Sequence, residues 1–271
     1  MKKCLFTAFA AIVLLAGCNS VAITGRKQLN LVDDSQVLAT SLTSYKEIIS
    51  KSKLSSDQSS TALVRRVGQN IANATENYLR NNGMSKDLQN YAWEFNLVEE
   101  NQFNAFCMPG GKIVVYTGLL NTIKNHPDCE AMLAAVVGHE VAHAVAKHSN
   151  ERMSQQLLTQ YGAKALSLGL QVGKAGALTS SIANKAYGLG SNYGVILPFS
   201  RKHELEADYM GMVLMSMAGY NPENAVKFWQ STSTGGSQSD FTSTHPSDAK
   251  RIAALQKALP EVKTKYYKAS R

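Results

Sequence analysis

Beyond its first eighteen residues, the sequence has no apolar run long enough to cross a lipid bilayer, which takes about 20 residues. The most apolar later stretch, residues 165–183, is interrupted by Lys174 and by several glycines and serines, so we interpret it as amphipathic helix and loop. Basic residues are scattered and are not interleaved with aromatic residues, although the net charge is +8. The sequence therefore predicts no membrane-spanning helix after the N-terminal segment and no nucleic-acid-binding face.

Cysteine is also scarce, with four residues in a chain of 271. Cys4 and Cys18 belong to the N-terminal segment, which leaves Cys107 and Cys129 for the folded part. These two could form a disulfide or stay two buried thiols. The sequence leaves both readings open, because it does not give the separation of the α-carbons.

The N-terminal segment MKKCLFTAFAAIVLLAGC begins with two lysines, continues as an apolar run and ends in small residues. This order predicts a signal peptide over residues 1–17. The ending LLAGC resembles a bacterial lipobox, which implies that Cys18 is lipidated; the alternative is an ordinary secretory signal with an incidental cysteine. Asn19 stands where an aspartate would imply retention at the inner membrane. We therefore expect a lipid anchor in the cell envelope, on the periplasmic face of the outer membrane.

The rest of the chain predicts one domain with a large core, since 44% of the residues are hydrophobic and no internal repeat or interdomain linker is visible. We expect an extended tether over residues 18–33 and a single domain over residues 34–271.

Helical periodicity and capping residues predict helices from about residue 34, through 60–83, 127–147 and 203–219, from about 222, and after 245. Between the second and third of these, alternating apolar residues in YAWEFNLVEE and NAFCMPGGKIVVYTGLL predict a small antiparallel sheet. The predicted fold class is α+β and mainly helical.

The segment HEVAH combines His139, Glu140 and His143 on a predicted helix that is otherwise apolar. Residues four apart lie on one face of a helix, so the two imidazoles can bind one metal ion. Glu140 beside them can take a proton from a metal-activated water, as a zinc hydrolase requires. So short a pattern can also arise by chance, but two histidines and a glutamate in an apolar helix need partners to offset their burial.

A catalytic zinc site needs a third protein ligand and one open position. His148 stands about 140° around the helix from His143, so we expect a solvated or capping histidine. In RKHELEADYMG, Glu204 and Asp208 are four residues apart on a predicted helix. We predict that Glu204 is the ligand and that Asp208 accepts the N–H of a ligand histidine, while Glu206 points elsewhere. The alternative is a solvated acidic face.

Three segments follow one another in the chain: VVGHEVAHAVAKH, LPFSRKHELEADYMG and STHPSDAKR. In this order and at these separations they resemble the zinc metallopeptidases related to CAAX prenyl proteases, above all their soluble periplasmic lipoprotein branch and the mitochondrial overlapping-activity protease. The resemblance covers about residues 22–260 and implies a gluzincin with a zincin-type metalloprotease domain and one Zn²⁺ per chain. The roles that it implies are zinc ligand for His139, His143 and Glu204, general base for Glu140, and support of a ligand for Asp208.

The segment NAFCMPGGKIVVYTGLL resembles the family's NAF-x-x-PGG signature. In zincins a strand beside the metal helix offers its free edge to an extended peptide through backbone hydrogen bonds. Residues 104–108 or 112–116 would supply that edge, with Asn104, Ala105 and Phe106 as candidate substrate-binding residues. The alternative is a plain hairpin of the core.

His245 precedes Pro246, which suits the first position of a helix, so His245 is a candidate N-cap. The family resemblance implies a different role near the zinc, where His245 would stabilise the oxyanion or occupy the open coordination position. We expect the loop over residues 231–245 to cover the site and restrain activity until substrate displaces it. Arg251 would either support the same pocket or lie on the surface.

Together these features predict a zinc-dependent endopeptidase in envelope protein quality control, acting on exposed or misfolded chains. The alternative is a chaperone-like outer-membrane protein assembly factor that uses the same groove with latent proteolysis. A purely structural zinc protein is disfavoured, because structural sites close all four positions, mostly with Cys and His. The sequence carries no signal for the oligomeric state.

Overall fold

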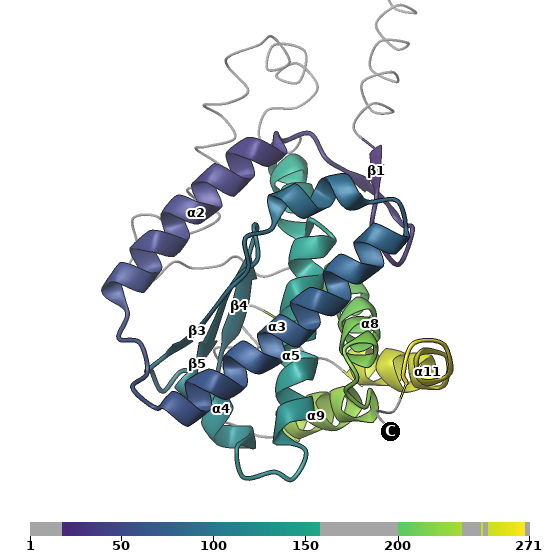
Figure 1. Ribbon diagram of the computed structural model, residues 1–271. Helices are drawn as coiled ribbons and strands as arrows, with labels where there is room; N and C mark the ends of the chain where they lie inside the picture. The colour runs from purple at the N-terminus through teal and green to yellow at the C-terminus, as the bar shows by residue number, and fades with distance from the viewer. Residues whose placement is uncertain (1–17, 158–199, 235–244, 246–248, 269–271) are drawn as a thin grey trace, which may run out of the picture.

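The computed structural model describes residues 18–157, 200–234, 245 and 249–268 (Figure 1). The fold class is α+β and mainly helical, as the sequence predicts. In chain order the elements are β1 (Cys18–Ser20), β2 (Lys27–Leu29), α2 (Asp34–Lys51), α3 (Gln58–Asn81), the 3₁₀ helix η1 (Ser85–Asn90), β3 (Glu94–Val98), β4 (Ala105–Met108), β5 (Lys112–Tyr116), α4 (Thr117–Ile123), α5 (Cys129–Val145), α8 (Arg201–Met217), α9 (Glu223–Thr234) and α11 (Ala249–Lys265).

Strands β3, β5 and β4 form a three-stranded sheet in that order, with β5 in the centre. β4 and β5 are an antiparallel hairpin, and Gly110 and Gly111 in its turn have φ of 96° and 77°, which glycine adopts without strain. β3 pairs with β5 in parallel, so the sheet is mixed and not wholly antiparallel. The hairpin places β5, and not β4, beside β3. The sequence could not predict this, because the alternation of apolar residues along a strand does not indicate which strand pairs with it.

Helices cover both faces of this sheet, which lies between α2 and the pair α3 and α5 (Figure 1). One face belongs to the main core and the other to a second cluster with α2. The strand residues of the main core are Phe95, Leu97, Ala105, Ile113 and Val115, and those of the second cluster are Val98, Phe106, Met108, Val114 and Tyr116.

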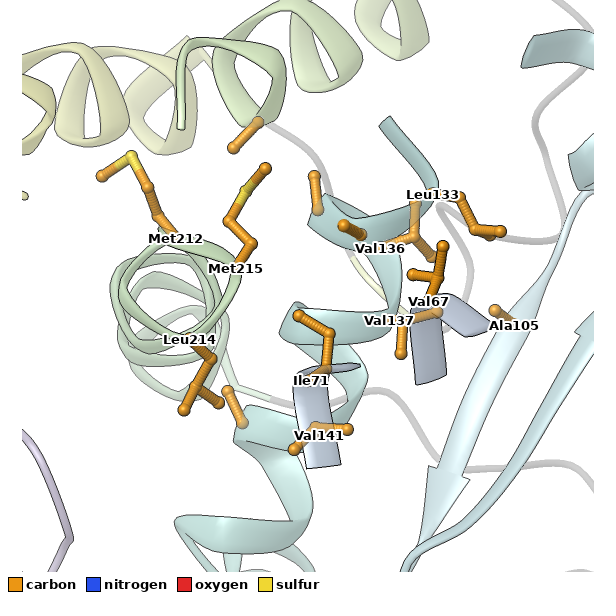
Figure 2. Packing of buried hydrophobic residues seen from close by; sticks show 14 of the residues in the cluster. Val67, Ile71, Ala105, Leu133, Val136, Val137, Val141, Met212, Leu214 and Met215 are labelled. Carbon is orange, nitrogen blue, oxygen red and sulfur yellow. The ribbon is translucent and has the colours of Figure 1, made fainter. Parts of the chain in front are cut away.

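Helix α5 runs through the middle of the main core. Figure 2 shows it between Val67 and Ile71 of α3 on one side and Leu214 and Met215 of α8 on the other. From Met132 to Val145 every residue of α5 except Ala144 is buried. Polar side chains in this buried stretch are shielded from bulk water and need partners inside the protein.

Residues 18–33 do not form the extended tether that the sequence predicts. β1 and β2 pair as an antiparallel hairpin with Cys18 opposite Leu29. Val21 and Ala22 in its turn are 3% and 8% exposed and belong to the main core. We call residues 18–29 the N-terminal arm; its residues pack on the domain because this short turn carries apolar side chains. The predicted signal peptide, residues 1–17, lies outside the described residues.

The predicted helix over residues 127–147 corresponds to α5, and the chain breaks directly after it. α5 ends at Val145, and a further helical segment, His148–Leu157, follows at an angle of 46°. Lys147 at the break has a φ of 53°, a left-handed conformation that costs roughly 1 kcal/mol for a residue with a side chain. Ion pairs of Lys147 with Asp34 and Asp87, at 2.7 and 3.4 Å, offset this strain.

Within the described part of the chain, no single helix is both long and apolar enough to cross a membrane. α5 and the segment His148–Leu157 reach that length and composition only together, across their bend. The apolar stretch over residues 165–183 lies outside the described residues.

Cys107 in β4 and Cys129 at the start of α5 are free thiols, each partly exposed. The sequence leaves open a disulfide or two buried thiols. In the structure the two cysteines are unpaired, but neither is fully buried.

Candidate metal centre

Helix α5 brings His139, Glu140 and His143 to one point of the core. The Nε2 atoms of the two histidines lie 3.1 Å apart, and the three residues are at most 2% exposed. Their spacing of one helical turn places the imidazoles on one face of α5. Since the intervening residues are alanine and valine, the polar groups meet their partners on other elements.

Helix α8 supplies two carboxylates to the same point. The fully buried Glu204 has one oxygen 3.4 Å from Nε2 of His139 and the other 3.4 Å from Nε2 of His143. One turn later, Asp208 Oδ1 lies 2.9 Å from Nδ1 of His139, on the opposite side of that imidazole. The structure thus brings together the histidines and carboxylates that the sequence singles out.

The backbones of α5 and α8 touch where these groups meet. A Cβ on Gly138 would lie 2.8 Å from the carbonyl oxygen of Gly211, and a Cβ on Gly211 would lie 2.6 Å from the backbone nitrogen of His139. Both distances are too short for a real Cβ contact. Glycine at both positions therefore permits the close crossing that carries Glu204 to the histidines.

His245 joins the group from a distant part of the chain. Its Nδ1 lies 3.2 Å from Nε2 of His139 and 3.2 Å from both oxygens of Glu204, while its Nε2 lies 3.3 Å from Glu140 Oε1. The residue is 2% exposed. Residues 235–244 and 246–248 lie outside the described residues, and so do most of the predicted covering loop and the predicted helix start at Pro246.

The ligand atoms of His139, His143, Glu204 and His245 all lie within 4.8 Å of one another. Four ligands about 2.1 Å from a tetrahedral zinc ion are about 3.4 Å apart. Five of the six pairs of these residues have ligand atoms 3.1 to 3.4 Å apart when both oxygens of Glu204 are counted, which is close to that spacing. Imidazole and carboxylate are also ligands that zinc takes in proteins, so the residues fit one tetrahedral ion.

Burial and close contacts shift the pKa values of these groups. Burial alone would raise the pKa of Glu204, but His245 and the two α5 histidines outweigh it and hold that pKa well below its ordinary value. Burial lowers the pKa of His143. Both shifts favour the forms that bind a metal, an ionised carboxylate and a neutral imidazole. Burial also raises the pKa of Glu140, which suits a carboxylate that accepts a proton near neutral pH.

Arg251 of α11 is buried in this centre and does not lie on the surface. Its guanidinium donates two hydrogen bonds of 2.7 Å to Asp208 and lies 3.0 Å from an oxygen of Glu204. The same guanidinium stacks 4.0 Å over the ring of Trp229, which is 5.0 Å from the ring of His139. Sequence reasoning missed Trp229, because nothing in NPENAVKFWQ separates a tryptophan beside a metal group from any other core tryptophan.

His148 corrects the expectation of a solvated or capping histidine. It is fully buried, with Nδ1 2.9 Å from Nδ1 of His143 and Nε2 3.0 Å from an oxygen of Glu206. The angular spacing that excluded it applies only within one continuous helix, and α5 ends at Val145. The break at Lys147 turns His148 back beneath His143. Glu206 stays out of the metal group, as predicted, but it is buried.

Of the two strands predicted to bind substrate, only β4 lies at the edge of its sheet, because β5 is paired on both sides. Among the described strands none pairs with the outer edge of β4. Asn104, Ala105 and Phe106 are all buried, at 8%, 1% and 5% exposed. Their side chains thus belong to the core, and this strand offers another chain its backbone groups and the partly exposed side chain of Cys107.

The outer edge of β4 lies beside Glu140. The carbonyls of Asn104 and Met108 accept hydrogen bonds from the β5 side, so the backbone groups of the alternate residue Cys107 point outward. The backbone of Cys107 is close enough to the Glu140 carboxylate to favour its ionised form. This contact places the free edge directly next to the group of metal-binding side chains.

Comparison with known proteins identifies relatives of this arrangement. The sequence model described as Peptidase family M48 matches residues 64–259. The mitochondrial metalloendopeptidase OMA1 of Schizosaccharomyces pombe is 35% identical over 254 residues, covering 90% of this chain and 67% of that protein. Human mitochondrial OMA1 is 30% identical over 62% of this chain and 33% of its own length. The β-barrel assembly-enhancing protease of Escherichia coli is 28% identical over 59% of this chain and 33% of its own length. This chain thus spans about two thirds of the first relative and a third of the other two.

Proposed function

The chain belongs to peptidase family M48, and we propose that it is a zinc-dependent endopeptidase whose metal is held by His139, His143 and Glu204. One observation carries the proposal: these three side chains converge in a buried group that also includes His245, with Glu140 next to it. Two imidazoles, one carboxylate and an adjacent free carboxylate are the parts that a zinc hydrolase needs.

Bound zinc supplies Lewis-acid activation of the attacking water and of the scissile carbonyl. Glu140 takes the proton of that water and passes it to the leaving nitrogen; its burial raises its pKa toward the range where a base can do both. Asp208 accepts a hydrogen bond from Nδ1 of His139 and so keeps Nε2 directed at the metal. Arg251 neutralises Asp208 and fixes its orientation.

His245 occupies the fourth corner of the group and restrains the enzyme there. Its Nδ1 faces His139 and Glu204 at 3.2 Å, where the water and the substrate carbonyl would otherwise be placed. Its Nε2 faces Glu140 at 3.3 Å and so also contacts the base. Substrate binding displaces His245, with residues 231–245, and opens the position.

The substrate pairs as an extended strand with the outer edge of β4, through residues 104–108. Backbone hydrogen bonds along an edge make few demands on substrate sequence, which suits unfolded chains of many kinds. A peptide on this edge would lie within reach of the base, because the backbone of Cys107 is close to Glu140.

The physiological setting is the cell envelope. The signal over residues 1–17 and lipidation of Cys18 would anchor the protein at the periplasmic face of the outer membrane. Two bacterial relatives are β-barrel assembly-enhancing proteases, and misfolded envelope proteins are the proposed substrates here.

Glu140→Gln tests the proposal, because it removes the base and leaves every metal-binding side chain in place. We expect unchanged zinc content by atomic absorption and a loss of about 10² to 10⁴ in the rate of casein hydrolysis. Glu130→Gln is the matched control, since Glu130 lies on the same helix but pairs at the surface with Arg66. Casein hydrolysis at the wild-type rate by the Glu140 variant would overturn the assignment.

A second candidate is a chaperone-like assembly factor that holds unfolded envelope proteins on the same edge with latent proteolysis. The name of the bacterial relatives, which refers to β-barrel assembly, favours testing it. In a strain that lacks the protein, full rescue by Glu140→Gln would support binding as the main role, and no rescue would support proteolysis. Comparing the envelope proteins that accumulate in the two strains would identify the substrates.

A further inference from the structure

The guanidinium of Arg26, in the turn of the N-terminal arm, binds two carboxylates from different helices. Its Nε donates to Glu206 at 2.6 Å, and its two terminal nitrogens donate to Glu151 at 3.0 and 2.6 Å. The hydroxyl of Thr24, in the same turn, donates to the other oxygen of Glu206 at 2.5 Å. The two carboxylate side chains are each 6% exposed and that of Arg26 is 17% exposed. The arm therefore covers both carboxylates, and its single positive charge offsets half of their combined negative charge.

The same two carboxylates contact a pair of stacked histidines on their inner side. Glu206 lies 3.0 Å from Nε2 of His148, and Glu151 lies 3.1 Å from Nε2 of His203. The rings of His148 and His203 stack with their centroids 4.4 Å apart. Nδ1 of His148 then reaches Nδ1 of His143 at 2.9 Å. An unbroken series of polar contacts runs from the arm to a proposed metal ligand.

The direction of these hydrogen bonds follows from the metal-facing atom. Nε2 of His143 faces the metal group, so its lone pair must be free and the ring proton must sit on Nδ1. That N–H donates to Nδ1 of His148, which fixes the proton of His148 on Nε2. The Nε2–H of His148 then donates to Glu206. Glu206 is ionised because Arg26 and Thr24 both donate hydrogen bonds to it. The hydrogen bonds along this series therefore allow only one tautomer of His148 and one of His143.

The two α5 histidines are thereby supported in parallel ways. His139 contacts Asp208 directly, and Arg251 holds Asp208. Nδ1 of His143 contacts His148, His148 contacts the carboxylate of Glu206, and Arg26 holds that carboxylate. Removing such outer partners of a metal ligand typically weakens metal binding 10- to 100-fold.

We propose that Arg26 is a positioning residue of the metal centre: through Glu206 and His148 it fixes the tautomer and the orientation of His143. The N-terminal arm is then part of the metal site and not only an attachment to it. This inference rests on the proposed function in one respect, that His143 binds a metal through Nε2.

The test measures the metal and not only catalysis. Two quantities are measured: the Zn²⁺ dissociation constant, by chelator competition, and the visible spectrum of the Co²⁺-substituted form. The proteins compared are the wild type, Arg26→Gln, Arg26→Lys and the control Lys27→Gln. Lys27 is the neighbouring exposed residue of the arm, and its amine bonds only to Ser20 among the contacts that the structure gives it. We expect Arg26→Gln to raise the Zn²⁺ dissociation constant several-fold, up to about tenfold, and to change the Co²⁺ spectrum. Arg26→Lys should recover part of the loss, and Lys27→Gln should match the wild type.

A purely structural ion pair would give a different pattern. In that case Arg26→Gln would lower the unfolding temperature but leave the Zn²⁺ dissociation constant and the Co²⁺ spectrum at their wild-type values, and the proposal would be overturned. Should Arg26→Gln not fold, Arg26→Lys and Thr24→Val decide by the same two measurements, since Thr24→Val removes one donor to Glu206 without removing a charge. A wild-type protein that binds zinc but hydrolyses no casein would count against the peptidase alone, because the metal measurements still decide the role of Arg26.

Discussion

Gly211 of α8 lies against the backbone of His139 in α5, so close that a Cβ on Gly211 would come within 2.6 Å of the His139 nitrogen. This contact determines the distance between the helix that carries the two histidines and the helix that carries Glu204 and Asp208. The geometry of the metal centre thus depends on a residue that has no side chain and takes no part in the chemistry.

Gly211→Ala is expected to separate the two helices. The added methyl group has backbone on its other side, which cannot move as a flexible side chain can, so we expect a loss of about 1–3 kcal/mol in the free energy of unfolding. The Zn²⁺ dissociation constant should also rise, because Glu204 moves away from the histidines. Denaturant unfolding of the metal-free protein and chelator competition measure the two effects. Lys202→Ala, at an exposed position of the same helix, is the control. Wild-type zinc affinity in Gly211→Ala would show that the centre tolerates a wider crossing.

His245→Ala is expected to increase the rate of peptide hydrolysis. The substitution empties the fourth corner and removes a group that contacts both Glu204 and Glu140. Loss of a contact worth about 1.4 kcal/mol would raise kcat/KM about tenfold. Three protein ligands remain, so zinc is retained with weaker affinity.

Rate and zinc content are measured together for His245→Ala, with the exposed His126→Ala as control. Retained zinc with a slower rate would assign His245 to stabilising the oxyanion. Unchanged zinc content and unchanged rate would end the proposal that His245 has any role at the metal.

Glu151 gives the stability of the protein a specific dependence on acid. Burial alone would raise its pKa, but His203 and Arg26 outweigh burial and lower the pKa from an ordinary value of 4.5 to about 2. Because the folded state holds the proton more weakly than the unfolded state, this stabilisation is fully present above about pH 4.5 and is lost as the pH falls toward about 2.

Glu151→Gln should therefore be less stable than the wild type near neutral pH, by about 2 kcal/mol after allowance for partial solvent screening. The difference should shrink between about pH 4.5 and 2, since both proteins then lack the charge. Denaturant unfolding in the presence of chelator measures this without the pH dependence of zinc release. Glu99→Gln removes an exposed ion pair with Lys53 and should change the stability by less than about 1 kcal/mol at neutral pH. A difference that stays constant over the acid range would contradict the assignment to Glu151.

The spacing of residues along single helices could be interpreted correctly from the sequence. His139 and His143, and likewise Glu204 and Asp208, are each one turn apart, and helical geometry alone places each pair on one face. The glycines after Pro109 likewise indicate the tight turn of the β4–β5 hairpin, since both take positive φ. The family resemblance then relates the two helices to each other, which spacing alone does not do.

Contacts between elements could not be predicted in this way. The parallel pairing of β3 with β5 depends on where the hairpin is placed. Trp229 looks like an ordinary core residue, and Arg251 is left between a pocket role and the surface, until α9 packs on α5 and α11 packs on α8 and α9. His148 was misjudged because the helix was taken to continue past Val145, whereas the chain bends there by 46°.

By itself the sequence determined which side chains can bind a metal, because a regular helix converts a spacing of four residues into a common direction. Only the tertiary structure decided what supports those side chains. Three contacts join residues that are separated by a helix break or lie far apart in the chain: His143 with His148, His245 with Glu204, and Arg26 with Glu206. Such contacts depend on how closely helices cross and how the chain turns between them, and no local periodicity encodes either.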